Sequence, residues 1–420
     1  MEINAKELLG FASVDDLALA GKTVLLRLDI NSPIDPGTKK IVSENRIVKS
    51  LPTVRKILAG GAKLVIIAHQ GDTLDYQNLI PMDEHAQRLS AHLGTEIAYI
   101  DDVCGPAAVA AVKALAPGQA ILLGNLRYLT EEVSTFENAV PLGPEEMGDT
   151  WLIRTLAPLC DYYVNDAFSA AHRASPSMVG FQRILPTAGG DLLIEELGAL
   201  TVVSAKPVRP CVFVLGGAKI SDAFGMLSPV LKNGTADKIL TCGVTGEVFL
   251  MAAGISLGPT KTKWIEERSL DAFVKDAASY LAEYPGKILA PLDLAYEEGG
   301  ARKEVAAGDL PVDAMFMDVG EKTVECYEKE IAQAGTIFMN GPAGAYENPL
   351  FAEGTKRIWE AVAGSVGYSV IGGGDTVSAA QKFGITDKIG YVCTAGGAMV
   401  RFLSGKELPL VTAMRGAVKP

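Results

Sequence analysis

One pattern recurs along this chain of 420 residues: a short apolar run ends at polar or glycine residues, and a stretch with helical spacing follows. Between Asn45 and Leu58, for example, Ile47, Leu51 and Val54 fall on one helical face. Strand and helix patterns that alternate in this way predict an α/β fold with parallel sheets and right-handed crossovers. The predicted strands cover residues 23–28, 63–68, 120–123, 162–164, 211–215, 238–242, 287–290, 336–339 and 368–371.

Polar side chains follow the predicted strands of the first half of the chain. Ligands of open α/β sheets bind beyond the carboxyl ends of the strands, so these side chains should converge. A cluster that contains Arg and His suits a carboxylate or a phosphate. Each residue alone has a plainer interpretation: a surface charge for Arg127, a loop histidine for His69, a helix cap for Asp166. The full set is Asp29, Asn31, His69, Asn125, Arg127, Asp166, His172 and Arg173.

Glycine-rich loops follow the strands of the second half. Residues 372–374 are three glycines, and Asp375 and Thr376 come next, at the start of a predicted helix. Glycines let backbone N–H groups approach an anion, and a helix start adds unpaired donors. Asp375 could hold a divalent cation. The alternative is an ordinary turn in which Asp375 or Thr376 caps the helix. The loop matches neither the Walker P-loop nor the dinucleotide fingerprint.

A lone lysine, Lys219, stands beside a second glycine pair at 216–217. Backbone amides, a lysine and a metal-holding carboxylate suit phosphoryl transfer, which depends on positioning and on neutralising charge. The alternative is a solvated lysine in the first turn of a helix, where the helix dipole disfavours a cation. The first half therefore predicts a site for an anionic substrate, and the second half predicts a site for a nucleotide.

Composition narrows the class of protein. A net charge of −12 and the absence of a Lys/Arg run argue against nucleic-acid binding. No apolar run reaches the ~18 residues of a membrane span, and the first residues do not resemble a signal peptide, so we expect a cytoplasmic protein without membrane partners. The six cysteines are scattered, which predicts neither disulfides nor a zinc site. Pro/Gly breaks at 186–190 and 206–210 mark the best domain boundary.

Ten segments in this order resemble the signature blocks of the phosphoglycerate kinase family, from about Val24 to Ala413. They are RLDIN (27–31), SENRI (43–47), AH (68–69), GNLRY (124–128), YVNDAFSAAHR (163–173), LGGAKISD (215–222), MDVG (317–320), NGPAGAYE (340–347), GGGD (372–375) and GKELP (405–409).

The resemblance implies two Rossmann-like three-layer domains with parallel sheets joined by a hinge helix. The expected parts are a phosphoglycerate-binding domain (1–185), a hinge helix (186–205), a nucleotide-binding domain (206–402) and a tail that packs back on the first domain (403–420). The implied activity is reversible phosphoryl transfer between 1,3-bisphosphoglycerate with ADP and 3-phosphoglycerate with ATP, in glycolysis and gluconeogenesis. It also implies Mg²⁺, small-molecule substrates, domain closure and a monomer.

The resemblance also assigns roles to individual residues. The residues implied to bind the phosphoglycerate are Asp29, Asn31, Arg46, His69, Arg127 and Arg173. Those implied to bind the nucleotide are Gly216, Gly217, Lys219, Gly243, Asn340, Glu347, Gly372, Gly373, Gly374, Asp375 and Thr376. Asp375 is the implied Mg²⁺ ligand. The implied catalytic set is Lys219, Arg46, Gly373 and Gly374.

The chain departs from the family pattern at several positions. Asp72 and Ala223 stand where the family has an arginine and a second lysine, Ser175 replaces a histidine, and residues 395–397 are Ala-Gly-Gly rather than three glycines. A carboxylate beside a bound phosphate would repel it by ~1–3 kcal/mol, unless a residue such as Arg55 or Lys40 compensates. Two alternatives therefore stay open: a paralogue that phosphorylates another carboxylate, and a nucleotide-binding protein with weak catalysis.

Overall fold

The computed structural model describes residues 9–71, 79–143 and 145–420, and it divides into two compact units. The first unit contains Met1–Gly198 together with Glu407–Pro420, and the second contains Ala199–Lys406. The division falls inside α8 (Asp191–Ala205), within the segment predicted as a hinge helix. No helix of the described ranges is long and apolar enough to span a membrane.

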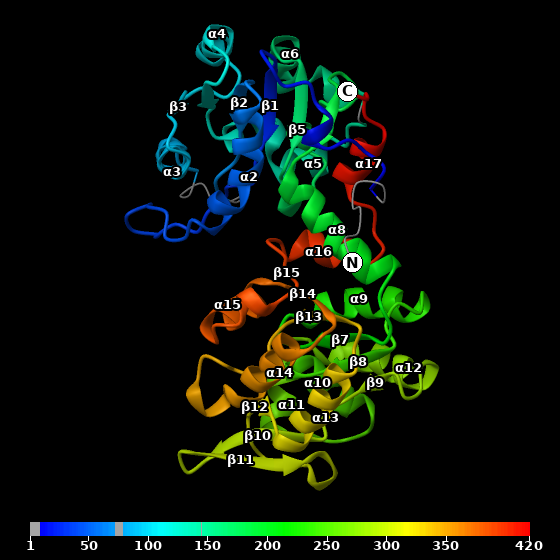
Figure 1. Ribbon diagram of the computed structural model, residues 1–420. Helices are drawn as coiled ribbons and strands as arrows, with labels where there is room; N and C mark the ends of the chain where they lie inside the picture. The colour runs from blue at the N-terminus through cyan, green and yellow to red at the C-terminus, as the bar shows by residue number, and fades with distance from the viewer. Residues whose placement is uncertain (1–8, 72–78, 144) are drawn as a thin grey trace. The chain divides into compact units, whose positions relative to one another are not determined.

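The first unit is built on a parallel sheet with the strand order β3-β4-β2-β1-β5-β6 (Figure 1). Its strands are β1 (Thr23–Arg27), β2 (Lys63–Ile67), β3 (Ile97–Tyr99), β4 (Ala120–Leu122), β5 (Tyr162–Asn165) and β6 (Thr187–Gly189). Its helices, besides α8, are α2 (Asn45–Ala59), α3 (Asp83–Leu93), α4 (Pro106–Ala114), α5 (Ser134–Ala139), α6 (Trp151–Leu156), α7 (Pro176–Val179) and α17 (Pro409–Arg415).

Both faces of this sheet are covered by helices because alternate strand residues point to opposite sides. Val24 and Leu26 of β1 pack in one core cluster with the apolar faces of α2 and α3. Leu25 packs in the other, with residues of α4 and α6. The strands are therefore apolar throughout, as expected for a parallel sheet in the middle of three layers.

The C-terminal helix belongs to this unit. α17 packs against α7 and β6, and the Leu410 N–H donates to the Ala171 carbonyl over 3.2 Å. The Thr187 N–H donates to the Val418 carbonyl over 3.0 Å, so chain beyond α17 also lies on the edge strand β6.

The second unit repeats the architecture with a parallel sheet of order β15-β14-β13-β7-β8-β9. Its strands are β7 (Cys211–Leu215), β8 (Lys238–Thr241), β9 (Ile288–Leu289), β13 (Thr336–Asn340), β14 (Tyr368–Gly372) and β15 (Tyr391–Val392). Its helices are α9 (Ile220–Lys232), α10 (Gly243–Ala252), α11 (Pro259–Glu266), α12 (Val274–Glu283), α13 (Glu321–Ala332), α14 (Glu353–Gly364), α15 (Gly374–Lys382) and α16 (Gly397–Leu403).

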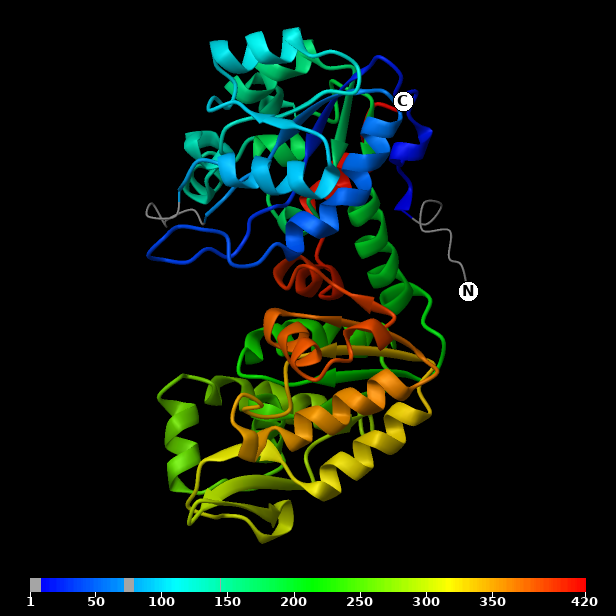
Figure 2. The same ribbon diagram turned by 60° about the vertical axis from the view of Figure 1, so that its left-hand side comes forward.

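One face of this sheet packs on α13 and α14, which lie side by side (Figure 2). Val212 and Val214 of β7 point to that face, while Phe213 packs at a tilt against Phe338 of β13 in the opposite layer, with ring centroids 5.1 Å apart. The predicted α/β class, with a parallel sheet in each half of the chain, is confirmed.

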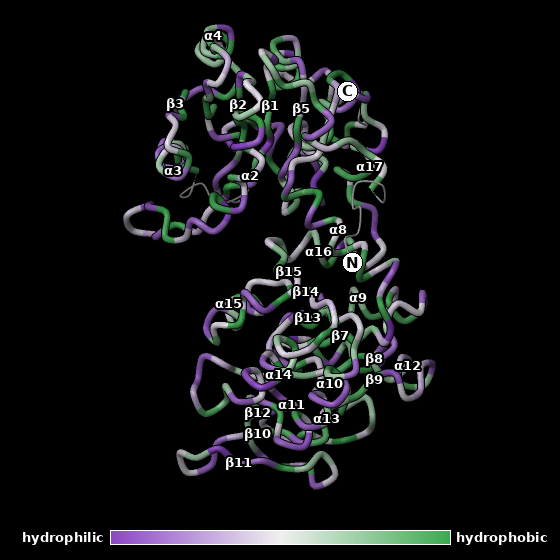
Figure 3. Tube along the Cα trace, viewed as in Figure 1, coloured by the Kyte–Doolittle hydropathy of each residue, from purple (hydrophilic) through white to green (hydrophobic). Residues whose placement is uncertain are grey.

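The sequence analysis did not predict a third sheet, which is antiparallel and belongs to the second unit. It consists of β10 (Asp293–Glu298), β11 (Ala301–Ala306) and β12 (Phe316–Val319) in the order β11-β10-β12. Half of β11 is exposed and the rest is half-buried, and the strand is largely hydrophilic (Figure 3), so it lacks the apolar run that marks a buried strand. The turn Gly299-Gly300, with φ of 63° and 80°, was the available signal, because two glycines between short strands favour a tight hairpin.

Candidate active site

The loops after β1, β2 and β5 start side by side at one edge of the first unit's sheet. Arg27, the last residue of β1, pairs with Ile67 of β2 and with Asn165 of β5. Asp29 and His69 follow two residues beyond these paired positions. The convergence of polar residues predicted from strand ends therefore exists for these neighbouring loops.

Arg46 is held in this region by a buried carboxylate. Its Nη1 atom lies 2.7 Å from Oδ2 of Asp29, and the Ser169 hydroxyl donates to the same oxygen. The Asp29 side chain is 3 % exposed and that of Arg46 is 32 % exposed. Asp29 therefore fixes a guanidinium that still reaches solvent at the start of α2.

His69 is neutral, and its tautomer follows from its neighbour Arg27. Nη2 of Arg27 lies 2.9 Å from Nδ1 of His69. Burial, and then the charges of surrounding arginines, hold the His69 pKa well below its usual value. A guanidinium can only donate, so Nδ1 accepts and the proton of the neutral ring lies on Nε2. His69 thus offers an N–H donor without a charge.

Four arginines act electrostatically on the His69 ring, in decreasing order Arg27, Arg127, Arg46 and Arg173. They come from the end of β1, from helical segments and from a loop, so the fold gathers positive charge at the carboxyl edge of the sheet. A cluster of this kind suits an anion with several oxygens.

Two asparagines tie the loops of this cluster together. The Asn125 side-chain oxygen accepts from the N–H groups of Gln70 and Arg127 over 3.1 and 3.0 Å. The Asn31 side-chain oxygen accepts from the Gly71 N–H over 3.0 Å. Asn31 and Asn125 thus fix the backbone that follows His69, which limits the freedom of Asn31 to bind a ligand through its oxygen.

Arg173 pairs with Glu137 of α5, a residue that the sequence analysis missed. Its Nε atom lies 2.7 Å from Glu137 Oε2, and the Ala174 N–H donates to the other carboxylate oxygen, also over 2.7 Å. Within the described ranges Nη2 of Arg173 is buried without a hydrogen-bond partner. One side of this guanidinium is therefore held by the protein, and the other has donor capacity left for a ligand.

The two basic residues considered above as partners for Asp72 contact other groups of the first unit. Lys40 Nζ lies 3.9 Å from Glu84, and Arg55 donates to the His92 carbonyl over 2.9 Å. Ser175 is buried directly before α7. Asp72 lies outside the described residues.

In the second unit, hydrogen bonds join the loops after β7, β13 and β14. The Asn340 side chain donates to the Gly372 carbonyl over 2.9 Å, and the Gly341 N–H donates to the Thr376 hydroxyl over 2.7 Å. The Gly217 N–H donates to the Pro342 carbonyl over 2.7 Å. Asn340 and Thr376 therefore shape the glycine loops through these contacts.

The loop before α15 requires glycine at one position. Gly373 has a φ of 93°, and a Cβ there would lie 2.6 Å from the Asn340 side-chain nitrogen. α15 begins at the next residue, Gly374, whose Cβ position is open. The N–H groups of the first turn, which lack helical acceptors, thus stand beside the exposed Asp375. A Cβ added at Gly396 would lie 3.8 Å from the Gly373 Cα, so the C-terminal glycine pair borders the same loop.

Lys219 directly precedes α9 and is exposed. We find no ion pair between Lys219 and any residue that the structure describes. Ala223, one turn further along α9, is 1 % exposed and packs in the interior, so it contributes no charge. Lys219 is therefore a cation available to a ligand of the neighbouring glycine loop.

A pocket of about 360 Å³ lies within this unit, next to these loops. Glu347 and Asp375 line it together with the glycines of the β7 loop and the apolar segment 315–317. The sequence analysis did not identify its remaining polar lining, namely Glu247 and Lys261. The full lining is Gly217, Ala218, Gly243, Val244, Glu247, Lys261, Trp264, Leu294, Met315, Phe316, Met317, Asp318, Val319, Pro342, Ala343, Gly344, Ala345, Glu347 and Asp375.

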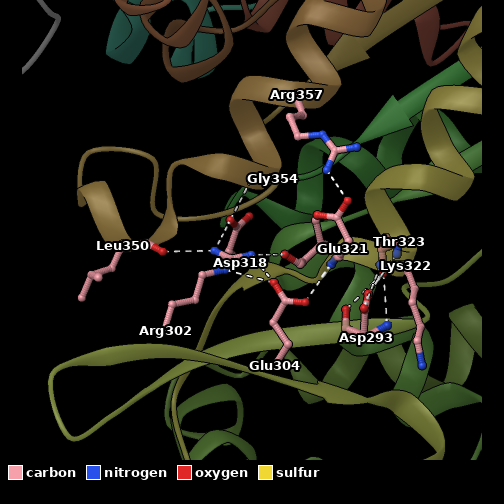
Figure 4. Close-up of polar contacts among 11 residues, drawn as sticks. Asp293, Arg302, Glu304, Asp318, Glu321, Lys322, Thr323, Leu350, Gly354 and Arg357 are labelled. Atoms are coloured by element: carbon pink, nitrogen blue, oxygen red, sulfur yellow. Dashed lines mark hydrogen bonds and ion pairs between the residues drawn. The ribbon is translucent and has the colours of Figure 1, made fainter.

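Asp318 of β12 lines the pocket and binds the segments that form one of its walls (Figure 4). Its Oδ2 accepts from Arg302 Nη1 over 2.8 Å and from the Gly354 N–H over 2.9 Å. A Cβ at Gly344 would lie 2.5 Å from the other oxygen, so the loop after β13 packs directly on this carboxylate. Burial raises the Asp318 pKa to about 6, and Arg302 opposes that rise.

Arg302 comes from the exposed strand β11 and joins several elements. It also contacts Glu304 over 3.1 Å and the carbonyls of Val319 and Leu350 over 2.7 and 3.1 Å. The Arg302–Asp318 pair therefore joins β11 to β12 across the antiparallel sheet, and the contacts with Leu350 and Gly354 attach this sheet to the segment that leads into α14.

Comparison with known proteins gives a consistent result over nearly the whole chain. A family model described as phosphoglycerate kinase matches residues 14–406. A phosphoglycerate kinase of Methanothermobacter thermautotrophicus is 38 % identical over 410 residues, 98 % of each chain. One of Methanococcus maripaludis is 41 % identical over 404 residues, 96 % of this chain and 97 % of the relative.

Solved structures agree in fold. The crystal structure of phosphoglycerate kinase from Pyrococcus horikoshii has a TM-score of 0.85 at 37 % identity and covers 96 % of this chain and 98 % of that one. That of the Coxiella burnetii enzyme has a TM-score of 0.80 at 33 % identity, with the same coverage. The family predicted from the motifs is confirmed: this chain belongs to the phosphoglycerate kinase family.

Proposed function

We propose that this chain catalyses reversible phosphoryl transfer between ATP and 3-phosphoglycerate, giving ADP and 1,3-bisphosphoglycerate. The observation that carries the proposal is the division of the ligand sites: one unit gathers arginines around a neutral histidine, and the other joins glycine loops at a pocket. These two sites fit a small acid with phosphate and carboxylate groups, and a nucleotide.

The acid would bind at the carboxyl edge of the first unit's sheet. Arg46, Arg127 and Arg173 would pair with its anionic oxygens, and His69 would donate through Nε2–H. Asp29 can only accept, so it would orient Arg46 and accept from the substrate hydroxyl. Asn31 would complete the pocket.

The nucleotide would bind in the pocket of the second unit. Glu347 would accept from the ribose hydroxyls, and N–H groups in the first turns of α10 and α15 would contact the phosphates. The N–H groups of Gly216, Gly217 and Gly243 donate to protein carbonyls, so these glycines would line the site by close approach of the backbone. The residues assigned to this site are Gly216, Gly217, Lys219, Gly243, Asn340, Glu347, Gly372, Gly373, Gly374, Asp375 and Thr376.

A divalent ion would arrive with the nucleotide. In the described ranges no three His, Cys, Asp or Glu side chains are grouped to hold a metal by themselves. Asp375 is exposed and lines the pocket, and a single carboxylate suits Mg²⁺, which usually binds one or two carboxylates plus phosphate oxygens. The ion would supply neutralisation of phosphate charge.

In the reaction a carboxylate oxygen of 3-phosphoglycerate attacks the γ-phosphorus. An acyl phosphate P–O bond forms, the bond to the β,γ-bridging oxygen breaks, and ADP leaves with that electron pair. The nucleophile is already anionic, so no general base is needed. Lys219, Arg46 and the N–H groups of Gly373 and Gly374 would neutralise the transferring group.

Direct transfer requires the two bound ligands to meet, so we propose that the units close on each other about the segment 186–205. Because one chain carries both ligand sites, we propose that the protein is a monomer, and that it works in the cytoplasm. We also propose that the tail 403–420 is part of the phosphoglycerate-binding domain. X-ray scattering should show a smaller radius of gyration with both ligands than with either alone. An unchanged radius would contradict closure.

The activity is tested by incubating the protein with ATP, Mg²⁺ and 3-phosphoglycerate and coupling the product to NADH oxidation. We expect turnover far above that of Lys219→Ala. Nucleotide binding with no turnover above that variant would support the non-catalytic alternative. Turnover only with another carboxylic acid would support the paralogue. If 3-phosphoglycerate is a substrate, a lower KM for it in Asp72→Arg would place Asp72 at the acid site, and an unchanged KM would place it outside.

A further inference from the structure

The nucleotide pocket contains a buried ion pair that none of the assigned roles uses. Lys261 of α11 lies 2.9 Å from Oε2 of Glu247 of α10, and the two side chains are 4 % and 5 % exposed. Both residues line the pocket. Taking two charges out of water is costly, so a pair in this position calls for a reason beyond stability.

Glu247 faces the same side of α10 as Gly243, the first residue of the helix. The two are four residues apart, one helical turn along α10. The wall around them is apolar, with Leu294 and Phe316, and the half-buried Trp264 lies beside Lys261. An apolar slot one turn beyond a phosphate-binding helix start is suited to a flat nucleotide base.

The donors of Lys261 are directed toward the protein. Its Nζ donates to the Phe316 carbonyl over 2.9 Å, pairs with Glu247 and lies 4.6 Å from the centre of the Trp264 ring. Lys261 therefore holds Glu247 in place and supports the charge of the carboxylate against burial, which by itself raises the Glu247 pKa.

Glu247 keeps acceptor capacity toward the pocket. A carboxylate has about four lone-pair sites, and within the described residues Lys261 is the one group found to act on it. This wall of the pocket therefore presents a hydrogen-bond acceptor, and not a donor, to a bound base.

We propose that Glu247, positioned by Lys261, accepts a hydrogen bond from the 6-amino group of adenine and so selects adenine nucleotides over purines with a 6-oxo group. The inference rests on the proposed function, because it takes the pocket of the second unit as the nucleotide site. Hypoxanthine and guanine place an oxygen where adenine has N–H donors, and that oxygen would face the carboxylate without a proton between them.

The test measures dissociation constants of ADP, IDP and GDP by isothermal titration calorimetry. The unmodified protein should bind ADP at least about tenfold more tightly than IDP or GDP. In Glu247→Gln the amide can donate to a 6-oxo group, so the ADP preference over IDP should fall to within about threefold.

Removing one charge leaves Lys261 buried without its partner, so the double variant Glu247→Gln/Lys261→Met is measured as well. It should show the same loss of preference. Glu347→Gln is the matched control: it removes another carboxylate of the pocket, assigned to the ribose, and should weaken ADP and IDP equally.

Equal binding of ADP and IDP by the unmodified protein, tighter binding of GDP, or an unchanged ADP-to-IDP ratio in both Glu247 variants would overturn the proposal. Failure of all three nucleotides to bind would instead overturn the proposed function on which it rests.

Discussion

The two units reach anion binding by different chemistry. In the first, the groups available to an anion are side chains that carboxylates hold: the buried Asp29 holds Arg46, and the half-buried Glu137 holds Arg173. In the second, they are mainly backbone N–H groups of loops in which Gly217 and Gly373 have positive φ.

This difference predicts how each site responds to mutation. A guanidinium site is sensitive to loss of charge or of the carboxylate that orients it, because fork geometry gives the binding its direction. In a backbone site only proline removes an N–H donor, so the effect of other substitutions comes from the added Cβ. The guanidinium site should select a particular acid, while the backbone N–H site should bind the phosphates that all nucleotides share.

Lys219 is the exception in the backbone site, and its loss should have the largest effect. Lys219→Ala should lower kcat by ~10²–10³-fold, since it removes a cation from the transferring group. Because Lys219 is exposed, thermal stability should not change. Lys232→Ala, at the other end of α9 and also exposed, is the control and should keep full activity. Steady-state kinetics showing equal kcat in both variants would remove Lys219 from the mechanism.

Two buried carboxylates, Asp166 in the first unit and Asp318 in the second, should differ in their effect on stability. Asp166 of the first unit is fully buried, and burial raises its pKa from 3.8 to about 7. It accepts from the Leu193 N–H at the start of α8 over 3.0 Å, and we find no cation paired with it within the described ranges. Asp318 of the second unit is instead paired with Arg302 over 2.8 Å.

The pKa of Asp166 is higher in the folded protein than in the unfolded chain. Ionised Asp166 therefore lowers the free energy of unfolding, fully above pH 7 and less and less as the pH falls toward 4. Asp166→Asn should therefore raise the free energy of unfolding at pH 8 by about 2–4 kcal/mol and have little effect near pH 4. Burial raises the Asp318 pKa less, to about 6, and Asp318→Asn takes a charged partner from Arg302, so this variant should gain less stability at pH 8 than Asp166→Asn. Urea denaturation at both pH values checks this, and a fall in stability for Asp166→Asn at pH 8 would contradict it.

An added Cβ should damage the backbone site where the structure leaves no room. Gly373→Ala places a Cβ 2.6 Å from the Asn340 nitrogen at a φ of 93°, which costs about 1–2 kcal/mol and should weaken ADP binding by about tenfold. Gly374→Ala is the matched control, because its Cβ position is open and its backbone is helical. Calorimetry that finds the same fold stability in both variants would show that the loop is not constrained.

The smallest expected effect is the loss of orientation in the side-chain site. Asp29→Asn keeps the size of the side chain but removes the charge that holds Arg46. The KM for 3-phosphoglycerate should rise about three- to tenfold, with the KM for ATP unchanged. A larger change for ATP than for the acid would place Asp29 outside the acid site.

Much of the fold could be predicted because each parallel strand is a buried apolar run that ends at polar or glycine residues. The predicted helix between Asn45 and Leu58 corresponds to α2, and the strand at 63–68 to β2. The antiparallel sheet was missed because β11 is exposed and charged, so its position depends on Arg302 reaching the buried Asp318 rather than on an apolar pattern.

The site residues also fall into those that the sequence could locate and those that it could not. Asp29 and His69 could be located from sequence because they directly follow strands. Glu137, Glu247 and Lys261 could not, because they lie on helices and reach the sites only through side-chain direction and packing. A Glu four residues inside a predicted helix gives no sign of whether it is solvated or buried against a lysine on another helix.

The central claim is that the two units divide the ligands between an arginine site and a glycine site. The most direct measurement is calorimetric binding of 3-phosphoglycerate and of ADP, each to the unmodified protein, to Arg46→Ala and to Gly373→Ala. We expect Arg46→Ala to weaken only the acid, by at least about tenfold, and Gly373→Ala to weaken only ADP. Loss of both ligands in either folded variant, or the reverse pairing of losses, would contradict this division.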